Sequence, residues 1–168
     1  MKKILVILGL LGTLLSADIL GTIGLGYSRG DNDGNYVTAF GQANFLAGIG
    51  IRLEYTKNVD EHKSFSKEDV SRYGVFATYT FSMLPVISIT PKAGLVKTDG
   101  EFSLKEVAGK LTSSKTRFTY GLEIDYDMNS QFSLFVGYTD YGKKLDIKDV
   151  DTKEMDKSNY MVGFKLHI

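Results

Sequence analysis

Residues 160–168 alternate between two kinds of side chain. Tyr160, Val162, Phe164, Leu166 and Ile168 share one parity, and Met161, Gly163, Lys165 and His167 share the other. Successive side chains of a strand point to opposite faces of its sheet, so this period of two predicts a strand with one wholly apolar face. Most of the upstream candidate strands repeat this division. The pattern favours a closed β-barrel whose apolar face meets lipid.

The alternation predicts eight strands joined by connections of alternating length. The predicted strands are residues 19–27, 36–44, 49–55, 72–81, 86–97, 117–127, 132–139 and 160–168. Connections are long after the odd-numbered strands and short after the even-numbered ones. We therefore predict an all-β fold, an eight-stranded antiparallel up-and-down transmembrane β-barrel, with both chain ends on the short-turn side.

Four local features of the chain give more specific expectations. The second strand is ambiguous, and we assign its lipid face to Val37, Ala39, Gly41, Ala43 and Phe45, because an amide in lipid costs more than a buried tyrosine. Residues 82–85 predict a tight turn, and Pro91 predicts a bulge, because proline cannot donate a ladder hydrogen bond. In the predicted loop 98–115, either a short helix or a hairpin extension fits, and the helical spacing is that of Leu104, Val107, Ala108 and Leu111.

The first residues have the three parts of a secretory signal peptide. Lys2 and Lys3 precede the apolar run 4–15, and Ser16 and Ala17 follow it. We predict a cleaved signal peptide over residues 1–17 and a barrel domain over 18–168. The alternative is a retained helical anchor, but the apolar run is too short to span a bilayer.

Composition excludes some classes of partner. The 20 basic and 20 acidic residues cancel, so nothing indicates nucleic-acid binding. Cysteine is absent, which is neutral with respect to compartment because an oxidising compartment permits disulfides without requiring them.

The size of the aromatic side chains, and their positions along the strands, favour a membrane barrel over a soluble, lipocalin-like one. The apolar face carries too many large rings for the narrow interior of an eight-stranded barrel. The rings also gather at strand ends, with aliphatic residues between them, which predicts two aromatic girdles. The loop-side girdle is Tyr27, Tyr55, Tyr73, Phe118, Tyr138 and Tyr160, and the turn-side girdle is Phe81, Tyr126 and Phe132.

The opposite parity collects charges of both signs inside the predicted barrel. These residues are Arg52, Glu54, Arg72, Lys92, Glu123, Asp125, Lys165 and His167. We interpret them as a structural network that fills the lumen, with an ion or proton path as the alternative. Lys92 and Glu123 lie on neighbouring strands at similar depth and are expected to pair.

No residue pattern indicates catalysis, a cofactor or a metal. His62 lies in a long loop and His167 beside the chain end, and neither has a serine or carboxylate at a sequence spacing that indicates a nucleophile and its base. Residues 31–34 lack the later glutamate of a calcium loop and are interpreted as a turn. We therefore expect no enzyme, no cofactor and no metal site.

The chain resembles the small outer-membrane β-barrel family of the OmpA transmembrane domain and OmpX, a porin-like family, over essentially its whole mature length. The most specific match is the strand Tyr160, Val162, Phe164, Leu166 and Ile168, which is similar to the family's terminal assembly signal, although it ends in Ile168 instead of an aromatic residue. The resemblance implies insertion by the barrel-assembly machinery and contact with outer-membrane lipids and lipopolysaccharide. It also implies periplasmic termini.

From these observations we expect a monomer with a side-chain-filled lumen in a bacterial outer membrane. Its expected role is to stabilise the membrane and to present its loops at the cell surface, where the loops adhere to an unidentified ligand. The alternatives are a lipid-modifying outer-membrane enzyme and a narrow pore or small-ligand carrier.

Overall fold

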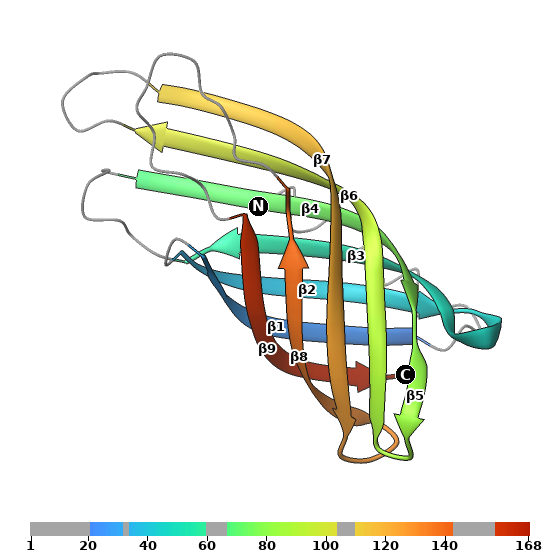
Figure 1. Cartoon of the computed structure of the whole chain (residues 1–168). Helices are drawn as coiled ribbons and strands as arrows, with labels where there is room; N and C mark the ends of the chain where they lie inside the picture. Colours follow the sequence, from blue (N-terminus) through green and yellow to red (C-terminus); the bar gives the residue numbers. More distant parts are fainter. Residues whose placement is uncertain (1–20, 32–33, 60–66, 104–109, 143–156) are drawn as a thin grey trace.

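The computed structural model describes residues 21–31, 34–59, 67–103, 110–142 and 157–168, which form one closed sheet (Figure 1). The strands are β1 (Gly21–Gly30), β2 (Asn35–Asn44), β3 (Ile49–Asn58), β4 (Lys67–Tyr79), β5 (Phe81–Leu84), β6 (Ile87–Ser103), β7 (Lys110–Asp127), β8 (Phe132–Asp140) and β9 (Ser158–His167). A 3₁₀ turn, η1 (Leu46–Gly48), joins β2 to β3. No helix among these residues is long and apolar enough to cross a bilayer.

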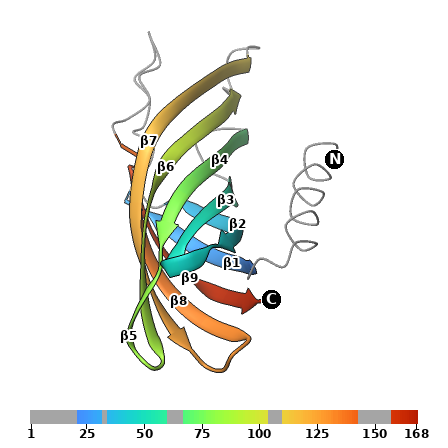
Figure 2. The same ribbon diagram turned by 90° about the vertical axis from the view of Figure 1, so that its right-hand side faces the viewer.

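Two pairings close the sheet into a barrel. The first strand pairs antiparallel with the last, from Thr22 opposite His167 to Gly30 opposite Asn159. On the other side, β4 pairs with both β3 and β6, and β5 continues the path of β4 along β6. With β4 and β5 counted as one passage, the predicted eight-stranded antiparallel barrel is confirmed (Figure 2).

The interruption between β4 and β5 lies opposite Pro91. The register is the same on both sides of it, with Thr78 opposite Lys92 and Phe81 opposite Ile89. Because Pro91 has no backbone N–H, the ladder with β6 lacks a donor opposite Tyr79, whereas on the other edge Thr80 continues the ladder with β3 by donating its N–H to the Gly48 carbonyl at 2.7 Å. The bulge predicted at Pro91 was therefore wrong in place, since the register shift falls between Ser82 and Leu84.

The strands on one side of the barrel are longer than the sequence pattern predicted. The tight turn predicted at 82–85 was wrong in its bounds, because residues 81–84 form β5, which pairs with β6 up to Leu84 opposite Ile87, and the turn lies at residues 85–86. The predicted loop 98–115 contains a hairpin extension, in which β6 and β7 pair as far as Ser103 opposite Lys110. Leu111 therefore lies in a strand, and the other three residues of the alternative helix lie outside the described residues, as do residues 1–20 with the predicted signal peptide and His62.

The alternation of side chains follows the predicted faces. In β2 the structure buries Tyr36, Phe40 and Gln42 in the interior and exposes Val37 and Phe45 on the outside, whereas Gly41 and Ala43 of the predicted lipid face are buried. Two apolar clusters lie within the lumen: Phe40 with Phe135 and Met161, and Phe76 with Val96 and Tyr141. The interior is therefore filled by both rings and polar groups.

Close approach of β9 to β1 requires glycine at position 163. A Cβ atom there would lie 2.1 Å from the Leu25 carbonyl oxygen and 2.7 Å from Cε1 of Phe135. We expect Gly163→Ala to lower the free energy of unfolding by about 1–3 kcal/mol through overpacking at the closing seam. Urea unfolding in lipid vesicles, followed by heat-modifiable gel mobility, measures the loss.

Gly137→Ala is the matched control for this substitution. Its added Cβ would come closest to the Glu123 Cγ atom, at 3.0 Å, which belongs to a side chain that can shift, and would lie at an ordinary contact distance of 3.5 Å from the Leu122 carbonyl oxygen. Equal losses in the two variants would contradict the special role of the β1–β9 seam.

Candidate functional site in the barrel interior

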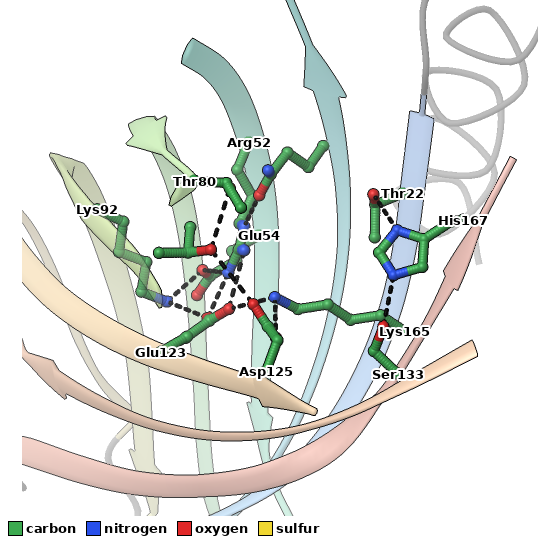
Figure 3. Close-up of polar contacts among 12 residues, drawn as sticks. Thr22, Arg52, Glu54, Thr80, Lys92, Glu123, Asp125, Ser133, Lys165 and His167 are labelled. Atoms are coloured by element: carbon green, nitrogen blue, oxygen red, sulfur yellow. Dashed lines mark hydrogen bonds and ion pairs between the residues drawn. The ribbon is translucent and has the colours of Figure 1, made fainter. Parts of the chain in front are cut away.

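Ionised side chains from four strands converge in the middle of the lumen (Figure 3). Arg52 and Glu54 come from β3, Lys92 from β6, Glu123 and Asp125 from β7, and Lys165 from β9. All six are buried, and the exposed fraction of both Arg52 and Glu123 is 0%. The odd–even alternation of each strand delivers these side chains to one side of the sheet, and barrel closure brings them together.

Arg52 is held from three directions. Its guanidinium forms a two-pronged contact with the Glu123 carboxylate, in which Nη2 donates to Oε2 at 2.9 Å and Nη1 donates to Oε1. Its Nε donates to Gln42 Oε1 at 2.8 Å, and its Cζ lies 4.1 Å from the centroid of the Phe40 ring. This planar, bidentate geometry is the one for which arginine is suited and lysine is not.

Lys92 has a closer partner than the one predicted. Its Nζ lies 3.5 Å from Glu123 Oε1, so the expected contact exists, but it lies 2.5 Å from Glu54 Oε2. Glu54 is on β3, and β4 separates that strand from β6 in the sheet. The principal pair is therefore formed across the interior instead of between adjacent strands.

Lys165 completes the network from the last strand. Its Nζ lies 2.6 Å from Asp125 Oδ1 and 2.9 Å from Glu123 Oε2. The second Asp125 oxygen accepts a hydrogen bond from the Thr90 hydroxyl at 3.3 Å. Each buried cation in this network thus faces two carboxylates, which offsets much of the desolvation cost that an isolated ion would carry.

Arg72 lies apart from this network, toward the loop side of the lumen. Its Cζ lies 4.5 Å from the centroid of the Tyr36 ring and 4.2 Å from that of Tyr141. Tyr36 lies in β2 and Tyr141 directly follows β8. This cation–π contact therefore spans the mouth of the barrel. Parity placed Arg72 inside, and Tyr141, which directly follows β8, continues the interior parity of Phe135 and Thr139, but the sequence did not indicate the contact between Arg72 and Tyr141.

His167 lies near the turn side, away from the central charges (Figure 3). Its Nδ1 is 3.1 Å from the Thr22 hydroxyl, and its Nε2 is 2.6 Å from Ser133 Oγ. The structure therefore gives His167 a serine partner that sequence spacing did not indicate. Ser133 donates its own proton to Asp127 Oδ1 at 2.5 Å, so it accepts from Nε2 and is not activated as a nucleophile.

The predicted girdle residues lie on the outside of the barrel. Cross-strand neighbours pack as tilted ring pairs, with ring centroids 5.1 Å apart for Tyr55 and Tyr73 and 5.3 Å apart for Tyr138 and Tyr160. Tyr27 and Phe118 are exposed toward the loop side, and Phe118 lies opposite Leu95, whereas Phe81, Tyr126 and Phe132 face outward at the turn side.

Within the described residues, no group of three or more histidine or acidic side chains could hold a metal ion.

The side chains that pack around the charges were the main omission of the sequence reasoning. Phe76 and Phe135 share the interior parity of their strands, so a signal for them existed. Lys165 Nζ lies 5.1 Å from the Phe135 centroid and Lys92 Nζ 4.9 Å from that of Phe76. These rings pack around the ion pairs inside the lumen.

Comparison with known proteins agrees with this architecture. A family model described as "Outer membrane protein beta-barrel domain" matches residues 12–167. No curated protein matched the sequence.

Three solved structures show the same fold. The N-terminal β-barrel domain of Pseudomonas aeruginosa OprF aligns with a TM-score of 0.67 at 13% identity, covering 89% of this chain and 97% of that one. The attachment invasion locus protein Ail of Yersinia pestis gives 0.57 at 17% identity, with coverages of 89% and 97%. Neisserial surface protein A gives 0.56 at 15% identity, with coverages of 88% and 94%.

The geometry predicts which buried pair is energetically coupled. Lys92→Met or Glu54→Leu alone should destabilise the barrel by about 3–5 kcal/mol, because either change leaves a buried charge without its closest partner. The double change should recover part of the loss, with a coupling energy of about 1–3 kcal/mol. Urea unfolding in vesicles gives the four free energies that the cycle needs.

The same cycle with Lys92→Met and Glu123→Leu is the comparison. Glu123 also faces Arg52 and Lys165, so its removal takes one of two carboxylates from each of these cations as well, and the double variant should recover less. A larger recovery in this second cycle would show that Glu123, and not Glu54, is the main partner of Lys92.

Proposed function

Because this chain belongs to the outer membrane protein β-barrel domain family, we propose that it is a closed barrel that stabilises the membrane and presents its loops at the cell surface. Its lumen is a plug of paired side chains and carries no steady current. It has no catalytic site and acts as a monomer in contact with outer-membrane lipids and lipopolysaccharide. The barrel-assembly machinery inserts it, using the strand β9 that closes the barrel against β1.

One contact carries this proposal: the Arg52–Glu123 pair. Strands β3 and β7 are separated by β4 and β6 on one side of the barrel and by β2, β1, β9 and β8 on the other, so a side-chain pair between them crosses the interior. Both side chains are fully buried. A conducting path would have to hydrate or displace this pair, and breaking a buried ion pair typically costs about 3–5 kcal/mol.

The surface-presenting part of the proposal rests on the loop-side strand extensions. Residues 98–103 of β6 pair with β4 on one side and β7 on the other, at the strand ends farthest from the short turns (Figure 1). A paired three-stranded extension of this kind is a platform that supports adhesion through the loops. Ail, a protein named for attachment and invasion, has also been solved in complex with a heparin analogue. The similarity of this chain's fold to that of Ail supports an adhesive role here.

An enzyme is disfavoured by the hydrogen bonds of His167. A hydrolytic site needs a base that accepts the nucleophile's proton. Ser133 gives its proton to Asp127 and is itself completely buried. The pair therefore supports the turn-side end of the barrel and does not provide an activated serine.

Conductance in planar bilayers tests the plug. The wild-type protein should show no steady current, because the lumen holds ion pairs and rings in place of a water column. The double variant Arg52→Ser, Glu123→Ser removes the bridge without leaving a lone charge and should conduct. Its current shows that protein prepared in this way inserts into the bilayer. A steady wild-type current would overturn the plugged-barrel proposal.

Surface labelling tests the orientation, in which both termini are periplasmic. The chain has no native cysteine, and Ser114 and Ser130 are exposed at opposite ends of the barrel. Ser114→Cys should react with a membrane-impermeant thiol reagent on whole cells, whereas Ser130→Cys should react only after the outer membrane is permeabilised. The opposite result would invert the topology.

A further inference from the structure

The lipid-facing surface is hollowed over four adjacent strands. A hollow of about 530 Å³ is lined by outward residues of β7, β8, β9 and β1 together with the backbone beneath them. It therefore lies across the seam where the first and last strands of the barrel pair. All of its lining residues are apolar or aromatic except Arg29.

Strand register arranges the lining residues in two rows. The turn-side row is Ile124, Val136, Val162 and Tyr27, and the loop-side row is Leu122, Tyr138, Tyr160 and Arg29. In the first row, two valines lie between an isoleucine and a tyrosine, so the surface sinks at its centre. In the second row, the tilted ring pair of Tyr138 and Tyr160 forms a raised rim.

The hollow has the shape and chemistry of an acyl-chain site. Val136 and Val162 are 54% and 55% exposed, so an occupant can contact them directly. Lipid contact alone would cover any outward valine, however, and so does not by itself define a site. The distinguishing feature is the charge at the loop-side end.

Arg29 is the cation of this hollow. It is exposed, points outward from β1 and lies directly opposite Tyr160 of β9. It also has a contact within the protein. A guanidinium has five N–H donors in a rigid fork that suits phosphate, so it can serve an internal partner and a phosphate oxygen together.

We propose that this hollow binds lipid A, the phosphorylated, acylated anchor of lipopolysaccharide. One acyl chain lies against Val136 and Val162, between Tyr27 and Ile124, and a lipid phosphate lies against the Arg29 guanidinium at the level of the Tyr160 ring. The assignment to lipid A rests on the proposed function, in which the loop side faces outward, because the lipid at that end then belongs to the outer leaflet. The hollow itself and its charge do not depend on the lumen being plugged.

Native mass spectrometry of the folded barrel in detergent, with purified lipid A added in increasing ratio, tests the site. Arg29→Gln should weaken lipid A binding about fivefold, the amount expected for loss of one cation near an anionic lipid surface. Val162→Phe, which fills the hollow but keeps Arg29, should weaken binding by a similar factor. Heat-modifiable mobility verifies that each variant is folded.

Matched controls lie on another sector of the barrel. Lys97→Gln removes an exposed cation of β6, and Val75→Phe enlarges an outward valine of β4 that is 54% exposed, with neither residue lining the hollow. Both controls should bind lipid A as the wild type does. Equal losses in Lys97→Gln and Arg29→Gln would show non-specific charge attraction and overturn the site.

Two lipid comparisons identify the ligand. Lipid A lacking its phosphates should bind the wild type and Arg29→Gln equally, since the phosphate contact is then absent from both. Phosphatidylglycerol should bind less tightly than lipid A, and an equal, Arg29-dependent affinity would overturn the assignment to lipid A. These results do not depend on conductance, so failure of the site and failure of the plug are distinguishable.

Discussion

The structure depends on one constraint: in lipid, every backbone N–H and C=O group must find a partner within the protein. An open sheet leaves two edges without partners, and this chain removes them by pairing β1 with β9 and β4 with β6. The closeness of that seam depends on small residues, since a side chain at Gly163 would collide with the Leu25 carbonyl. Beside Pro91, where the ladder with β6 lacks a donor, the chain keeps its pairing with β3, since Thr80 donates to the Gly48 carbonyl.

Closure turns the same alternation into two separate environments. The interior of an eight-stranded barrel is only just wide enough for its side chains, so the polar groups there must satisfy one another. Arg52, Lys92 and Lys165 face Glu54, Glu123 and Asp125, and the rings of Phe76 and Phe135 pack against the two lysines. The pairing crosses the lumen, and this is what supports a plug over a pore.

The outside of the barrel follows a different rule, because lipid satisfies apolar surface everywhere. Only departures from a uniform surface can then distinguish one lipid from another. The two valines beneath the Tyr138–Tyr160 pair, with Arg29 at the same level, form such a departure. It lies on the seam that closes the barrel, so a lipid bound there would bridge the first and last strands.

The amino-acid sequence by itself determined the strands, their two faces, the aromatic levels and the set of interior charges, because a period of two assigns each residue to one side of a sheet. It also placed Arg72 and Lys165 inside. It did not determine which interior side chains contact one another. Lys92 contacts Glu54, His167 contacts Ser133 and Arg72 stacks on Tyr141. Those contacts join residues that are not adjacent in the pattern, and they depend on the stagger of the strands and the width of the closed barrel. The length of the loop-side extension at residues 98–103 was likewise decided by hairpin pairing. The sequence pattern did not predict this extension, because strands outside the lipid need no apolar face.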